Sequence, residues 1–169
     1  MNWNITVERA AKSRLPEIDF NNIPFGKAFS DHMFVVDYDG VEWVNPRIQP
    51  YQKMSLAPSN LALHYGQSIF EGMKATKFGG VPYLFRPEMH AQRLNKSARR
   101  MCMPELPEDL FMLALEKLIE IDADFVPEKE DHALYIRPFM FATDEFFGVH
   151  VSQNYSFMIL EHGNTYPKS

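Results

Sequence analysis

The alternation of apolar and polar residues predicts a chain rich in β-hairpins. Four strand segments fall into two pairs, each closed by a short turn, and two more segments follow late in the chain. The predicted strands are residues 33–36, 41–44, 73–78, 81–85, 133–142 and 155–160. Asp39-Gly40 and Gly79-Gly80 are the turn signals. Pro82 lacks a backbone N–H, so its strand is expected at a sheet edge or at a bulge.

Apolar residues three and four positions apart predict three helices. The first begins at Pro58 and ends at Gly72. Its apolar face comprises Leu61, Tyr65 and Ile69. The second begins at Pro87 and ends before Pro104, and the third begins at Pro107, because proline is tolerated in the first turn of a helix. The apolar faces of these two comprise Ala91, Leu94, Ala98 and Met101, and then Phe111, Ala114, Leu115, Leu118 and Ile119.

This order of elements predicts an α+β fold. Hairpins and a few helices, without a regular alternation of strand and helix, favour a two-layer sandwich of a mainly antiparallel sheet with about three helices. Residues 1–32 are polar and interrupted by prolines, and we expect them to form an N-terminal arm. Residues 33–160 hold the predicted strands and helices and form the domain itself. Residues 161–169 are expected to form a divergent tail.

Charge and cysteine content narrow the classes of function. Seventeen Lys and Arg against 22 Asp and Glu give a net charge of −5, which argues against a nucleic-acid partner. Cys102 is the only cysteine, so no disulfide forms within the chain. The N-terminus does not resemble a signal peptide, and no apolar run is long enough to span a membrane. We therefore expect a cytoplasmic protein with no membrane partner.

Arg137 is the first residue that suggests a binding site. It lies in an alternating segment in which residues 135, 137 and 139 share one face, so that Tyr135 and Phe139 flank it. A guanidinium between two aromatic side chains suits bidentate binding of a carboxylate. An arginine at a sheet edge paired with a structural acid is the alternative, and spacing by itself favours that alternative.

The other candidates are ambiguous from spacing. Arg93 lies on the second predicted helix, where it is either a surface charge or a phosphate ligand. Tyr65 and Phe70 read as core aromatics, and Gly72 reads as a helix C-cap. His64 has no second histidine or carboxylate at ligand spacing, so we predict a buried, hydrogen-bonded side chain and no metal site. Three other histidines are equally isolated in the sequence, namely His32, His90 and His150.

A series of segments in a fixed order carries a resemblance to a known family. The most specific are residues 63–75 (LHYGQSIFEGMKA) and 134–139 (LYIRPF). Further matching segments are residues 25–33, 84–87, 92–94, 97–104 and 148–149. From about residue 24 to about residue 159 the chain resembles the branched-chain amino-acid aminotransferases, in the fold-type IV group of pyridoxal 5'-phosphate (PLP) enzymes. D-amino-acid transaminases and aminodeoxychorismate lyases share this fold, but the extended N-terminal arm and the segments at residues 70–75 (FEGMKA) and 135–139 (YIRPF) favour the branched-chain enzymes.

The resemblance implies the small, N-terminal domain of such an enzyme, with PLP as cofactor. Its substrates would be the branched-chain amino acids and their 2-oxo acids, together with glutamate and 2-oxoglutarate. Arg93 would contact the cofactor phosphate. Phe70, Gly72 and Tyr135 would line the pocket for a leucine, isoleucine or valine side chain. Arg137 would bind the distal carboxylate of glutamate when glutamate occupies the same pocket.

The resemblance also implies a homodimer. Tyr65 and the loop that carries Phe147 and Val149 would reach across the dimer interface into the substrate site of the partner.

In the family, the lysine that forms a Schiff base with the cofactor lies in a second, larger domain, which we expect to be absent from these 169 residues. The lysines of this chain do not stand in a matching context; they include Lys27, Lys53, Lys74 and Lys77. We therefore expect no catalytic residue in this chain and no transamination by the chain alone. The alternative is a catalytically silent domain that acts as a binding or interaction module.

Overall fold

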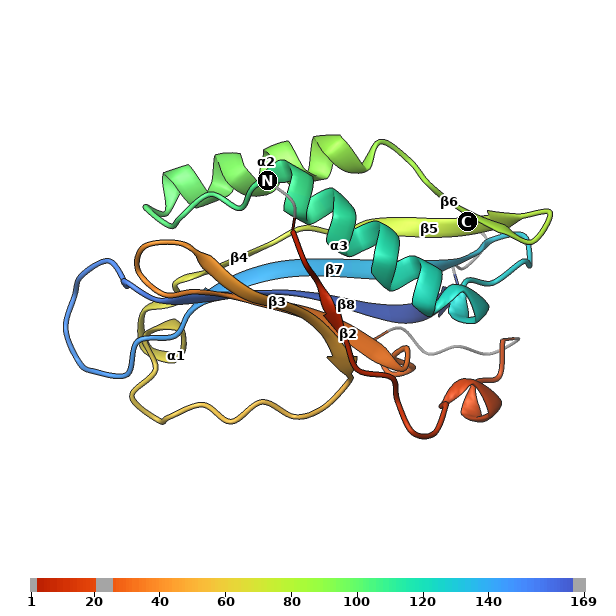
Figure 1. The fold of residues 1–169 in the computed structure, drawn as a ribbon, viewed down its shortest axis with the longest axis horizontal. Coiled ribbons are helices and arrows are strands. Elements are labelled where there is room, and N and C mark those ends of the chain that lie inside the picture. The colour runs from red at the N-terminus through yellow and green to blue at the C-terminus, as the bar shows by residue number, and fades with distance from the viewer. Residues whose placement is uncertain (1–2, 21–25, 166–169) are drawn as a thin grey trace.

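The computed structural model describes residues 3–20 and 26–165, which form one sheet with helices on its faces (Figure 1). The sheet has eight strands in the order β1-β3-β2-β8-β7-β5-β6, with β4 paired to β7. The strands are β1 (Thr6–Val7), β2 (His32–Tyr38), β3 (Trp43–Pro50), β4 (Ser68–Phe70), β5 (Met73–Phe78), β6 (Val81–Leu84), β7 (His132–Ala142) and β8 (Tyr155–Thr165). The helices are α1 (Leu61–Tyr65), α2 (Pro87–Arg100) and α3 (Glu108–Ile121), with short 3-10 turns at Leu15–Glu17 and Ala123–Phe125.

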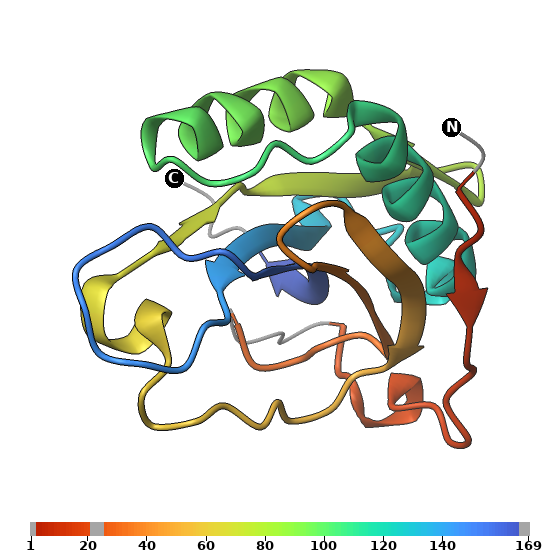
Figure 2. The ribbon, with the colours of Figure 1, turned by 60° about the vertical axis from the view of Figure 1, so that its left-hand side comes forward.

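Every described strand pairing is antiparallel except that of β1 with β3, so the predicted α+β fold with a mainly antiparallel sheet is confirmed. The amphipathic helices α2 and α3 lie together over one face of the sheet, as Figure 2 shows. The main core fills the space between them, with Leu94, Leu115 and Phe157 among its buried side chains. A smaller apolar cluster covers the other face and comprises Met33, Val35, Phe141 and Met158.

The second predicted hairpin and the two long helices match β5, β6, α2 and α3 closely. Pro82 lies on β6, which is the last strand of the sheet, so the prediction of an edge strand is confirmed. In the first hairpin, β3 runs to Pro50 rather than ending near residue 44. A bulge makes this possible, because the register shifts so that Asn45 and Pro46 together lie opposite Val36.

The first predicted helix is too long. α1 ends at Tyr65, because Gly66 adopts a left-handed conformation (φ 62°) and its N–H donates to the carbonyl of Ala62. The chain then becomes extended, and Ser68–Phe70 pairs with β7. Ile69 is therefore a strand residue, and Gly72 lies between β4 and β5 instead of ending a helix.

β8 continues five residues beyond its predicted end. Residues 161–165, expected in the tail, pair with residues 132–136 of β7. At the other end of the chain, β1 from the expected arm adds to β3. Residues 1–2 and 21–25 of that arm, and residues 166–169 of the tail, lie outside the described residues.

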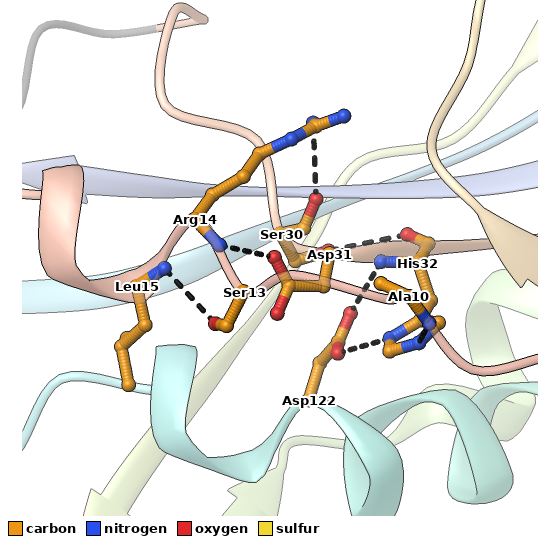
Figure 3. Close-up of polar contacts among 8 residues, drawn as sticks. All are labelled: Ala10, Ser13, Arg14, Leu15, Ser30, Asp31, His32 and Asp122. Atoms are coloured by element: carbon orange, nitrogen blue, oxygen red, sulfur yellow. Dashed lines mark hydrogen bonds and ion pairs between the residues drawn. The ribbon is translucent and has the colours of Figure 1, made fainter.

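A buried polar network fastens the N-terminal arm to the sheet (Figure 3). The N–H of Ala10 donates to His32 Nε2 over 2.9 Å, so the ring proton is on Nδ1, which bonds Asp122 Oδ1 at 2.6 Å. The N–H of Arg14 donates to Asp31 at 2.7 Å. His32 is therefore not isolated in the structure. Its partner Asp122 lies 90 residues away in the sequence, so local spacing does not reveal the contact. Beside this network Glu161 is fully buried, and neither of its carboxylate oxygens has a hydrogen-bond partner among the described residues.

Candidate functional site

Arg137 lies between two aromatic rings on the face of the sheet opposite α2 and α3. Its guanidinium carbon is 4.2 Å from the ring centre of Phe70 and 5.2 Å from that of Tyr135. Its Nε and Nη2 both donate to the hydroxyl of Tyr135, at 3.2 Å and 2.8 Å. We call Phe70, Tyr135 and Arg137 the arginine clamp. The second ring is Phe70 and not the predicted Phe139, which stacks on Phe141 instead.

Strand pairing explains why Phe70 reaches Arg137. β4 pairs with β7 so that Phe70 lies directly opposite Phe139, and residues directly opposite share a face of the sheet. Phe70 is exposed, so it is not the core aromatic that its spacing suggests. Gly72 follows in the same segment, and a Cβ atom on it would overlap the Tyr135 hydroxyl. Glycine is therefore required there because it leaves room for the clamp.

The clamp presents a cation beside apolar surface. Two of the five N–H groups of Arg137 donate to Tyr135, which leaves the others for an incoming acceptor. Within residues 3–20 and 26–165, no carboxylate forms an ion pair with Arg137. The structural ion pair that spacing favoured is therefore not seen in the described part of the chain. The same small surface can contact a carboxylate through the guanidinium and an alkyl group through the ring faces.

His162 packs against the arginine clamp. Its ring stacks on Tyr135, with centroids 4.9 Å apart and planes at 29°, and packs edge-on against Phe29. Burial lowers the pKa of His162, and the nearby charge of Arg137 lowers it further, against the opposing effect of the bond to the Gly163 carbonyl, so the neutral ring is favoured. No local pattern singles out this residue, since the contact depends on the pairing of Tyr135 with His162 in a segment expected to be a tail.

Arg93, the expected phosphate contact, lies on α2 and pairs with Glu71. Its Nε and Nη2 donate to the two carboxylate oxygens at 2.6 Å and 2.5 Å, and His90 Nδ1 lies 3.0 Å from the same carboxylate. Burial alone would raise the pKa of Glu71, but the bonds from Arg93 and His90 outweigh it and the pKa lies below its ordinary value. The hydrogen bonds that Arg93 donates to Glu71, together with the negative charge of that carboxylate, raise the pKa of Arg93. Spacing did not single out Glu71, although its place next to Phe70 directs it to the opposite face.

Tyr65, Phe147 and Val149 gather on an exposed surface made by α1 and the loop between β7 and β8. The N–H of Gly148 donates to the Tyr65 hydroxyl at 3.2 Å, and the Phe147 ring packs edge-on against His64 at 5.1 Å. His64 also bonds the carbonyl of Pro58, but it is exposed and not buried as predicted. Among the described contacts, none joins these three residues to Arg137 of the same chain.

No group of three or more His, Cys, Asp or Glu side chains in the described part of the chain is arranged to hold a metal ion. None of the described helices combines the length and apolar character needed to cross a membrane.

Comparison with known proteins places these features in a family. No family model matches the chain. It is 46% identical over 144 residues to branched-chain-amino-acid transaminase 1 of Bacillus subtilis (strain 168), an alignment that takes in 84% of this chain and 40% of the relative. The chain thus spans about two fifths of the length of that relative.

Solved structures share the fold. The branched-chain amino acid aminotransferase from Escherichia coli superposes with a TM-score of 0.57 and 26% identity, over 80% of this chain and 41% of that chain. A T.th. branched-chain amino acid aminotransferase complexed with N-(5'-phosphopyridoxyl)-L-glutamate gives a TM-score of 0.54 and 21% identity, over 75% of this chain and 40% of that chain. The chain is therefore similar to the N-terminal part of the branched-chain aminotransferases, and its fold is that of the small domain of the fold-type IV aminotransferases.

Proposed function

We propose that this chain is the substrate-side part of a transaminase that exchanges amino groups between leucine, isoleucine or valine and 2-oxoglutarate. The arginine clamp is the observation that carries the proposal. A transaminase of this kind must accept an apolar side chain and an anionic one in the same pocket. The clamp offers two aromatic walls to the first and one guanidinium to the second.

The geometry of Arg137 suits both tasks. Its guanidinium packs against the face of Phe70 and is tied to the Tyr135 hydroxyl, so the charge lies at the wall of the pocket. An alkyl side chain meets the rings without having to displace a buried ion pair. The distal carboxylate of glutamate meets the remaining N–H groups in charge-assisted hydrogen bonds. Gly72 keeps Tyr135 in the position that both substrates use.

PLP is the cofactor that this reaction requires, and Arg93 suits its phosphate. The side chain of Arg93 is 62% exposed while its partner Glu71 is 4% exposed, so one edge of the guanidinium is docked and the other faces solvent. The T.th. relative is complexed with a molecule that joins pyridoxyl phosphate to glutamate. When bound, PLP supplies an electrophilic carbon that takes up the amino group from one substrate and delivers it to the next. The residues of this chain bind and orient, and the reactive lysine comes from a further domain.

The proposed dimer surface comprises Tyr65, Phe147 and Val149. They are exposed, they lie together, and they do not contact the clamp of their own chain among the described contacts. In a homodimer they would close the pocket of the partner and shield it from water. The protein would act in the cytoplasm on small substrates, without nucleic-acid or membrane partners.

Arg137→Gln tests the function of the clamp. It is expected to weaken binding of glutarate by about 10-fold to 100-fold, because a charge-assisted hydrogen bond contributes about 1.5–3 kcal/mol. Binding of 4-methylpentanoate, which has no distal carboxylate, should change little. NMR titration of the 169-residue chain measures both dissociation constants. Arg47→Gln is the control, since Arg47 lies on β3 and pairs with Asp37. An equal loss of affinity for both ligands would mean that Arg137 has a structural role and does not bind the distal carboxylate.

A second experiment tests the absence of a reactive lysine. Mixing the chain with PLP and reducing it with borohydride should give no stoichiometric lysine adduct in the intact mass, because no lysine in the sequence stands in the family context. Heterogeneous low-level labelling is the expected background. A single labelled lysine that glutamate protects would mean that the chain carries its own reactive lysine, and the proposed division of labour would be wrong.

A further inference from the structure

The three residues Phe70, Glu71 and Gly72 connect two cationic sites. Phe70 packs on Arg137, and Gly72 makes room for Tyr135, so both belong to the arginine clamp. Glu71, between them, points the other way, toward α2. Its N–H donates to the carbonyl of Pro138 over 2.8 Å, which fastens the segment to β7 directly beside Arg137.

The carboxylate of Glu71 is buried and fully engaged. Both of its oxygens accept from Arg93, and one also lies within hydrogen-bond distance of His90. His90 and Arg93 are three residues apart on α2, so they approach the carboxylate from the same helix face. A buried carboxylate needs such partners because burial otherwise penalises its charge. The ion pair therefore fixes α2 to the segment that carries the clamp.

Arg93 is held by one edge only. Two of its five N–H groups donate to Glu71, and the side chain remains largely exposed. A long exposed arginine normally samples many rotamers and loses that freedom on binding a ligand. Here the buried carboxylate has already restricted it. The outer edge of the guanidinium therefore has a defined direction before any anion arrives.

We propose that Glu71 is a positioning residue that orients Arg93 for a phosphate group and fixes this anion site relative to the arginine clamp. This inference rests on the proposed function, in which Arg93 receives the cofactor phosphate. The connection runs through one short segment: Glu71 holds Arg93, while its neighbours on either side hold Arg137 and Tyr135. The spacing of phosphate and substrate carboxylate is thereby set within this chain.

Glu71→Gln tests the proposal because a positioning role and a purely electrostatic role of Glu71 predict opposite changes in phosphate affinity. Removing a negative charge beside Arg93 should tighten anion binding if Glu71 acts by charge alone. Loss of the two-pronged grip should instead free Arg93 and weaken binding of inorganic phosphate by about tenfold. NMR titration of the full chain with phosphate gives the affinity. The heteronuclear NOE of the Arg93 Nε–Hε group, which should fall in the variant, reports on its order.

Two matched variants complete the test. Arg93→Lys keeps the positive charge but cannot grip Glu71 with two N–H groups, so phosphate affinity should fall in this variant as well. Glu105→Gln releases Arg99 from a solvent-exposed carboxylate at the other end of α2, and should leave phosphate binding unchanged. Phosphate affinity that is unchanged or tighter in Glu71→Gln, with Arg93 still ordered, would overturn the positioning role.

Arg93→Ala separates this inference from the function on which it rests. If phosphate binding is lost in Arg93→Ala but kept in Glu71→Gln, Arg93 is the anion ligand and Glu71 does not position it. If Arg93→Ala binds phosphate as the wild type does, both the cofactor contact and its positioning are overturned. Binding of glutarate at Arg137 is measured without phosphate, so the test of the arginine clamp does not depend on either of these outcomes.

Discussion

Gly72→Ala is expected to weaken glutarate binding by about tenfold and to lower the free energy of unfolding by about 1–3 kcal/mol, the usual range for overpacking. The new methyl group would overlap the Tyr135 hydroxyl and come within 3.1 Å of its Cζ atom. Either Tyr135 or the backbone at position 72 has to move. Both movements disturb the clamp that we propose binds the carboxylate.

Tyr135 cannot move without losing contacts. Its ring is stacked on His162, and its hydroxyl accepts two N–H groups from Arg137. A hydroxyl at the end of an unrestrained side chain could swing aside at little cost. Here a shift of the ring would break the stack and release the guanidinium, so binding and stability should fall together.

Tyr135→Phe provides the matched background. Phenylalanine lacks the hydroxyl that the new methyl group would strike, so Gly72→Ala should cost less stability in Tyr135→Phe than in the wild type. Urea denaturation of the four proteins measures this coupling. The same loss in both backgrounds would mean that the methyl group acts elsewhere, for example through the backbone between β4 and β5.

The parts of the site that follow from local sequence were predictable. The alternation of residues 135–139 places Tyr135 and Arg137 on one face, and the structure confirms this. The pair Gly79-Gly80 fixes the second hairpin, and the apolar spacing of α2 and α3 fixes their buried faces, except that Met101 lies beyond the end of α2 and is exposed. Each of these signals depends on neighbours in sequence, so it is independent of how the strands are ordered.

The remaining parts depend on long-range pairing. Phe70 joins Arg137 because β4 adds to β7, yet the helical spacing of residues 61–69 concealed the end of α1. Glu71 meets Arg93 only when α2 packs on the sheet. His162 reaches Tyr135 through a register that no local pattern specifies. The residues that complete the site thus come from contacts that only the folded sheet creates.

Glu161→Leu is expected to stabilise the chain at neutral pH by about 1–3 kcal/mol, because it removes a buried acid that has no hydrogen-bond partner among the described residues. Burial raises the pKa of Glu161 well above its ordinary value of 4.5, and the nearby negative charge of Asp122 adds to the effect. The Ser30 hydroxyl, which donates to the carbonyl of His32, offsets little of this. Asp122 stays bonded to His32 in the variant.

The pH dependence identifies the cause. A carboxyl whose pKa is raised in the folded state favours folding most when it is protonated, at pH values below its unfolded pKa near 4.5. That advantage is lost as the pH rises through the folded pKa, so the difference between Glu161→Leu and the wild type should grow from acid to neutral pH. Urea denaturation across this range measures it.

Glu161→Gln separates ionisation from the missing hydrogen bonds. Glutamine has nearly the same shape as glutamate and does not titrate. The difference in stability between Glu161→Gln and Glu161→Leu should therefore not depend on pH, although Glu161→Gln keeps an unsatisfied buried polar group. Its stability should therefore lie between those of the wild type and Glu161→Leu at neutral pH. If the wild type and both variants respond to pH in parallel, the pKa of Glu161 is the same in the folded and the unfolded chain, and burial does not raise it.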